Sequence, residues 1–111
     1  MILIAIAFFT VAALLGIYLL SYVLQHKNTP KGVAITHGSI AAMGLIILII
    51  YSILYSPTPL ISIAIFILAA LGGVYLMYRD IFGKSLPIGL AVGHGLIAMI
   101  GFVFLILFVW G

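Results

Sequence analysis

The chain has no cysteine, a single acidic residue and few charges of any kind: 5% of its 111 residues are charged and 68% are hydrophobic. Without cysteine, the protein can form no disulfide, iron–sulfur cluster, zinc–thiolate site or thiolate nucleophile. With so little polar surface, it cannot fold as a water-soluble globule. We therefore interpret it as an integral membrane protein whose surroundings are the lipid bilayer.

Four apolar stretches fill almost the whole sequence, at 2–24, 31–55, 60–79 and 86–110. Each is long enough to cross a bilayer as a helix. Because the linkers between them are short, neighbouring helices must be antiparallel. The predicted fold is all-α: a single integral membrane domain, residues 1–111, that forms an up-down-up-down four-helix bundle. The first stretch is too long for a signal peptide and lacks its basic segment, so we interpret it as a mature helix.

All five charged side chains are predicted to lie at the first and third linkers: Lys27, Lys31, Arg79, Asp80 and Lys84. The positive-inside rule places these linkers in the cytoplasm and both termini on the other side of the membrane. We expect this membrane to be a prokaryotic inner (plasma) membrane. The net charge of +3 is then a topology signal, and we expect no nucleic-acid partner.

The sequence matches itself at an offset of 57 residues, which aligns 1–54 (repeat 1) with 58–111 (repeat 2) without a gap. Of the 54 aligned pairs, 22 are identical, whereas the biased composition alone would give about one match in ten. The excess indicates a duplicated helical hairpin. Since each repeat has two spans, the two copies are parallel and related by an axis along the membrane normal.

The repeats match densely where each carries a histidine among small residues. The two sets are Ala34, His37, Ala41 and Gly44, and Ala91, His94, Ala98 and Gly101. On a helix, each set forms one stripe about 80° wide. The rise from His37 to Gly44 is about 10 Å, comparable to the width of a porphyrin, so a flat macrocycle could lie along the stripe.

Two interpretations compete for this pattern. Small residues let transmembrane helices approach closely, and histidines can hydrogen-bond between helices. However, an ionisable side chain inside a span is rare and points to function. The second and fourth helices sit diagonally in the bundle, roughly 11–14 Å apart, and opposed imidazoles ligating one metal would span about 13 Å. Because no further ligand for bare zinc or copper lies nearby, we predict that His37 and His94 are the axial ligands of one haem iron.

At this point the chain resembles membrane b-type cytochromes of the cytochrome b561 kind. The resemblance rests on the two histidines, the four-helix layout and the glycines Gly38, Gly44, Gly95 and Gly101. It implies a protein that binds haem b and transfers electrons with a quinone, superoxide or a partner oxidoreductase. That family carries a second histidine pair for a second haem, whereas Ile50 and Leu107 stand thirteen residues after the histidines here. We therefore expect one haem per chain.

Further candidate residues surround the predicted haem. Ala41, Ala98, Gly44 and Gly101 would line its slot. Tyr18 and Tyr75 would hydrogen-bond a propionate or line an entrance, or belong to an interfacial aromatic belt. Lys31 and Lys84 would pair with propionates, or with lipid headgroups.

Other functions stay open from the sequence. Small multidrug transporters have a similar length and four spans, but that family depends on a glutamate in its first helix, and residues 1–24 contain no acidic residue. A structural subunit is the third class, with histidines that only bond between helices. The sequence also leaves open whether the protein is an enzyme, and whether haem binds within one chain or across a homodimer interface.

Overall fold

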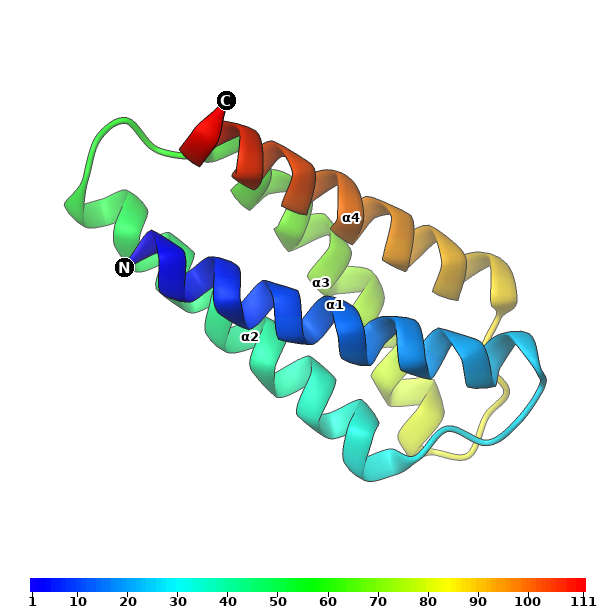
Figure 1. Cartoon of the computed structure of the whole chain (residues 1–111). Helices are drawn as coiled ribbons and strands as arrows, with labels where there is room; N and C mark the ends of the chain where they lie inside the picture. Colours follow the sequence, from blue (N-terminus) through cyan, green and yellow to red (C-terminus); the bar gives the residue numbers. More distant parts are fainter.

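The computed structural model describes the whole chain, Met1–Gly111, as four α-helices joined by short linkers (Figure 1). The helices are α1 (Ile2–Leu24), α2 (Lys31–Leu54), α3 (Leu60–Ile81) and α4 (Ile88–Trp110). All four are long and apolar enough to cross a membrane, since helices of this length reach about 33–36 Å at 1.5 Å per residue. The predicted all-α fold with four membrane spans is confirmed.

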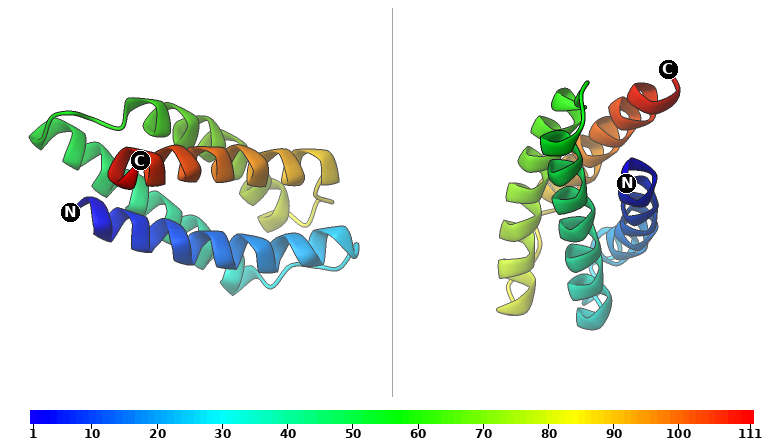
Figure 2. Two further views of the ribbon diagram at one scale, coloured as in Figure 1. Left: turned by 45° about the horizontal axis from the view of Figure 1, so that its top comes forward. Right: turned by 90° about the vertical axis from the view of Figure 1, so that its left-hand side faces the viewer.

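The helices form a closed bundle in which each packs against two others (Figure 2). The most extensive packing is within the pairs α1–α2 and α3–α4, and the bundle closes through α2–α3 and α1–α4. The diagonal pairs, α1–α3 and α2–α4, have no backbone contact. Both termini lie at one end of the bundle together with the α2–α3 linker, and the other two linkers lie at the opposite end (Figure 1). The predicted up-down-up-down order is confirmed.

Two helices end in the same way at the charged end of the bundle. The Lys27 N–H donates to the Tyr22 carbonyl, and the Lys84 N–H to the Arg79 carbonyl, both at 2.9 Å. Each bond closes a turn through a residue with positive φ, His26 at 56° and Gly83 at 70°. This is the Schellman arrangement, which satisfies carbonyls at a helix end.

Three helix bounds differ from the predicted spans by one or two residues, because α2 ends at Leu54, α3 ends at Ile81 and α4 begins at Ile88. The Thr29-Pro30 pair predicts a cap followed by the first helical residue, but α2 begins at Lys31 without a side-chain cap. The Thr29 hydroxyl instead donates to Asp80 Oδ2 at 2.5 Å. Because α3 continues to Ile81, Asp80 lies in its last turn and is buried, rather than in a solvated linker.

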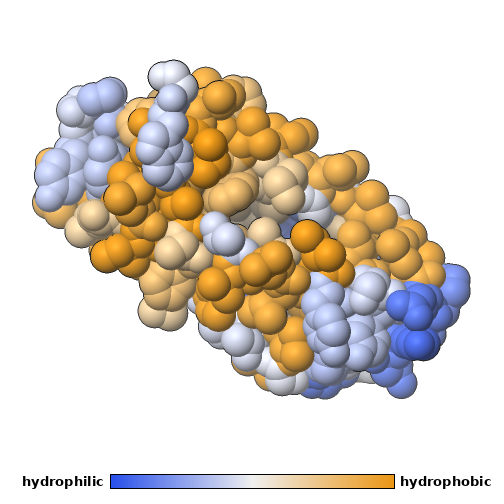
Figure 3. Space-filling model, in the orientation of Figure 1, coloured by the Kyte–Doolittle hydropathy of each residue, from blue (hydrophilic) through white to orange (hydrophobic).

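The hydrophobic core occupies the half of the bundle nearest the termini. At its centre the rings of Phe9 and Phe66 stack with centroids 4.0 Å apart, and Leu48 and Leu105 beside them are fully buried. The outer surface is mostly hydrophobic, the most strongly hydrophilic surface lies at the charged end, and weakly hydrophilic surface also lies at the end that carries the termini (Figure 3). The aromatic core therefore fixes one half of the bundle and leaves the other half to the smaller side chains around the histidines.

Candidate functional site

His37 of α2 and His94 of α4 meet across the diagonal of the bundle. Their ring centroids are 6.3 Å apart, and the ring planes are nearly perpendicular, at 87°. Both side chains are half-buried. The structure thus brings together the two histidines that the sequence places inside spans.

Each imidazole is held by a backbone carbonyl of the preceding helix. His37 Nδ1 lies 2.8 Å from the Ala12 carbonyl oxygen, and His94 Nδ1 lies 2.8 Å from that of Ala69. A carbonyl only accepts, so Nδ1 must carry the proton in both rings. Nε2 of a neutral imidazole then has a free lone pair, and no hydrogen bond within the protein uses it.

Glycines of α1 and α3 make room for the two rings. A Cβ placed on Gly16 would lie 3.0 Å from Cε1 of His37, and one placed on Gly73 would lie 3.0 Å from Cε1 of His94. Any side chain at these positions would push the imidazole aside. Each ring is therefore fixed by two features of its neighbouring helix, a carbonyl that orients Nδ1 and a glycine that admits the ring edge.

The spacing of the rings fits a pair of axial ligands. A metal–nitrogen bond is about 2 Å long, and the centre of an imidazole lies about 1.1 Å from Nε2 by its bond lengths. Two imidazoles in line on one metal therefore have centroids about 6.2 Å apart, close to the 6.3 Å of His37 and His94. No cluster of three or more His, Cys, Asp or Glu side chains forms in the chain, so this arrangement suits a metal that brings its own equatorial ligands.

A hollow lies on the outer face of the bundle between α1 and α4, and hydrophilic surface is visible at its floor amid apolar surroundings (Figure 3). Polar surface at this depth is unusual, because lipid offers it no partner. The hollow shows that the interior of the histidine half is not sealed by large side chains on this face.

The predicted slot glycines lie against the aromatic core. A Cβ on Gly44 would lie 3.2 Å from atoms of Phe8 and Phe9, and one on Gly101 would lie 3.1 to 3.2 Å from Ile65 and Phe66. Both glycines are buried, and they allow α2 and α4 to pack closely on those side chains. Ala41 and Ala98 are half-buried between the histidines and these glycines.

The two predicted tyrosines are exposed near the charged end of the bundle. Tyr18 shares a hydrogen bond of 3.0 Å with the hydroxyl of Tyr22. Tyr75 accepts a hydrogen bond of 3.4 Å from Arg79 Nη1, and the guanidinium also lies over its ring. Neither tyrosine contacts a histidine in these interactions, and both lie where an interfacial aromatic belt would.

The predicted lysines have different surroundings. Lys31 forms an ion pair with Asp80, and its ammonium also donates to the Thr29 hydroxyl at 3.2 Å. Lys84 is exposed, with Nζ 5.1 Å from the ring centroid of Tyr78. The polar cluster of Thr29, Lys31 and Asp80, called here the Asp80 cluster, joins the start of α2 to the end of α3.

Ala12, Ala69, Gly16 and Gly73 are the site residues that sequence reasoning missed. Each pair is identical between the repeats, so the signal for them was present. Periodicity does not reveal these contacts, because a helix that is apolar all round gives no indication of its rotation about its own axis. A small residue on α1 could therefore face the histidine, α4 or lipid.

Comparisons with known proteins identify no relative of this chain. A scan against protein-family models finds no match, and neither does a search of curated proteins or of solved structures. The geometry of the histidine pair is therefore the main indication of function.

Proposed function

We propose that the protein is a membrane b-type cytochrome that binds one haem b between His37 and His94. The observation that carries this proposal is the pair of free Nε2 lone pairs on rings 6.3 Å apart. A structural role for the histidines accounts for the Nδ1 bonds alone. It leaves two acceptors without partners inside a membrane, where unsatisfied polar groups are costly.

The surrounding residues are suited to hold such a ligand pair. A hydrogen bond from Nδ1 to a carbonyl fixes the orientation of a metal-binding histidine and raises its basicity. Ala12 and Ala69 supply this bond from equivalent positions. Haem b, when bound, supplies one-electron redox chemistry, and the chain supplies the axial ligands, their orientation and an apolar medium.

The charged end of the bundle suits the propionates of a haem. His37 lies seven residues beyond Pro30, so its Cα is about 10 Å from the start of the helix by helical rise. Lys27, Arg79 and Lys84 lie at that end, where charge-assisted hydrogen bonds to carboxylates are favourable. We propose that this end is cytoplasmic, following the positive-inside rule. The electron partner would be a quinone, superoxide or a partner oxidoreductase.

The test is to purify the chain after expression with adequate haem and to record a reduced-minus-oxidised spectrum and a pyridine haemochrome titration. We expect the sharp alpha band of low-spin haem b and about one haem per chain. The doubly substituted His37→Ala/His94→Ala chain is the matched control and should lack both signals. Absence of haem from the native chain would contradict the proposal, and two haems per chain would contradict the single axial pair.

A further inference from the structure

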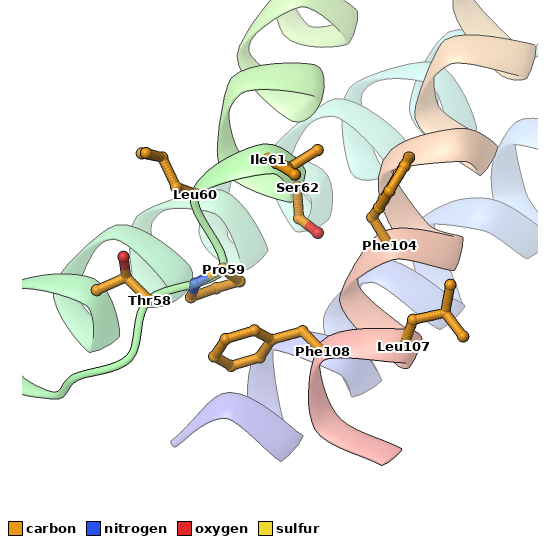
Figure 4. A pocket seen from close by; sticks show the side chains of 8 residues that line it. All are labelled: Thr58, Pro59, Leu60, Ile61, Ser62, Phe104, Leu107 and Phe108. Carbon is orange, nitrogen blue, oxygen red and sulfur yellow. The ribbon is translucent and has the colours of Figure 1, made fainter. Parts of the chain in front are cut away.

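A groove lies at the terminal end of the bundle, opposite the charged linkers, between the start of α3 and the end of α4 (Figure 4). Its volume is about 510 Å³, within the range of small-molecule sites. Apolar side chains dominate the lining, and Phe104 and Phe108 of α4 form one wall. The groove therefore offers a largely apolar surface with two aromatic rings.

One polar side chain points into this groove. Ser62 is 2% exposed, and Figure 4 shows its hydroxyl directed into the space bounded by Pro59, Phe104 and Phe108. This hydroxyl forms no hydrogen bond within the protein, and it is not sealed off from the groove. Because lipid chains offer this hydroxyl no hydrogen-bond partner, a ligand in the groove that accepts its hydrogen bond would be stabilised there.

The backbone beside Ser62 adds two further donors. Ile61 and Ser62 lie in the first turn of α3, where N–H groups have no intrahelical partner. No side chain caps this turn. The first turn of α3 lines the groove, so its free backbone groups are hydrogen-bond donors, and the Ser62 hydroxyl beside them can donate as well.

The counterpart of this site in repeat 1 is different. The residue equivalent to Ser62 is Ala5, which is 0% exposed in the hydrophobic core, and Phe104 corresponds to Ile47. An alanine at this helix position thus packs without difficulty. The hydroxyl of Ser62 and the ring of Phe104 are features of repeat 2 alone, and packing does not require them.

We propose that this groove binds a lipid-soluble quinone, with a quinone carbonyl accepting a hydrogen bond from the Ser62 hydroxyl and the ring lying against Phe104 and Phe108. A neutral acceptor is favoured because no charged side chain lines the groove, and all charged side chains lie at the opposite end. An anionic head group would be unpaired there. That the quinone exchanges electrons with the protein rests on the proposed function, whereas its binding does not.

Trp110, the only tryptophan, provides a probe two residues beyond Phe108. Quinones quench tryptophan fluorescence on close approach, so a benzoquinone with a decyl tail is titrated into the purified protein in nanodiscs of fixed phosphatidylcholine content. We expect saturable quenching. Ser62→Ala should weaken binding about three- to tenfold, the loss expected for one hydrogen bond. Ser62→Thr should restore it, and Ser39→Ala, at an exposed serine of α2, should leave it unchanged.

Decylbenzene, which has the same tail and a ring without carbonyls, tests the alternative that the groove simply holds acyl chains. It should compete poorly. Equal competition by decylbenzene, quenching that does not saturate, or equal affinity in the native and Ser62→Ala proteins would each overturn the proposal. Haem content is measured on the same samples. Quinone binding without haem would refute only the proposed function, and one haem per chain without saturable quenching would refute only this inference.

Discussion

The hairpin of α1 and α2 and the hairpin of α3 and α4 are most alike at their histidines and least alike at the two ends of the bundle. At the histidines, both copies use the same carbonyl bond of 2.8 Å and the same glycine contact of 3.0 Å. Towards the termini, Ser62 stands opposite Ala5 in the alignment. The two copies therefore share the arrangement around the histidines and differ in the residues at the two ends of the bundle.

The charged end shows the largest difference between the copies. The Asp80 cluster has no polar equivalent, because Thr29, Lys31 and Asp80 correspond to Leu86, Ile88 and Val23. The α2–α3 contact therefore has a polar tie at this end, whereas side-chain hydrogen bonds are missing from the α1–α4 contact. If the bundle opens, the α1–α4 side is the weaker one.

The largest effect is expected at the histidines, where the copies are alike. His37→Ala and His94→Ala should each abolish six-coordinate low-spin haem, and to a similar extent, because in the proposed site each ring would supply one axial lone pair. Optical spectra and haem-to-protein ratios measure this, with His26→Ala in the first linker as the control. If one variant kept the full low-spin spectrum, the opposed-pair arrangement would be wrong.

The second effect tests the glycine contacts in both copies. Gly16→Leu and Gly73→Leu should weaken haem retention by roughly five- to 150-fold, because overpacking of this kind costs about 1–3 kcal/mol and displaces the imidazole. Haem loss to an apo-haem acceptor protein measures it. Gly89→Leu is the control, since a Cβ there meets nothing within 4 Å. Equal retention in all three variants would show that ring placement does not depend on these glycines.

The third effect concerns the Asp80 cluster, which only one side of the bundle has. Asp80→Asn should lower the free energy of unfolding by about 1–3 kcal/mol, since it removes the charge that the half-exposed Lys31 ammonium pairs with. Thermal unfolding in mild detergent measures the change. Lys31→Met combined with Asp80→Asn should cost less than the sum of the single changes. Strict additivity would mean that the pair contributes no coupling, and Lys27→Met serves as the surface-charge control.

The smallest effect compares the two helix ends that share the Schellman arrangement. His26 has positive φ where Gly83 stands in the other copy, and a non-glycine residue in this region is disfavoured by roughly 1 kcal/mol. His26→Gly should raise the apparent midpoint of thermal unfolding slightly, and Gly83→Ala should lower it. A fall with His26→Gly would show that the histidine side chain contributes more than its backbone conformation costs.

The sequence predicted the architecture well, because hydropathy and linker length determine it. Four apolar runs separated by short linkers leave one arrangement of neighbours, which placed His37 and His94 on diagonal helices. The bounds at Leu54, Ile81 and Ile88 differ from the prediction by one or two residues, and Thr29 bonds across the bundle to Asp80 instead of capping its own helix. Long-range polar pairs of this kind leave no local signal.

Helix rotation was the part that sequence could not supply. His37 and Gly44 lie on the same stripe of α2. That stripe is wide enough for His37 to face α4 while Gly44 faces α1. Gly44 accordingly lies against the ring of Phe9 of α1. His37 lies against Gly16, a residue of α1 that the stripe on α2 does not indicate. The small residues and their identity in the two repeats predict close helix contacts, but they do not predict which residues meet.

Electron paramagnetic resonance of the ferric protein tests the central claim most directly. The two imidazole planes are 87° apart, and the bonds to Ala12 and Ala69 hold each ring in its orientation. Because perpendicular axial imidazoles make a ferric low-spin haem strongly anisotropic, we predict a single low-spin signal with a large maximum g value. A high-spin signal, or the rhombic signal of parallel imidazoles, would contradict the assignment of His37 and His94 as an opposed, backbone-anchored axial pair.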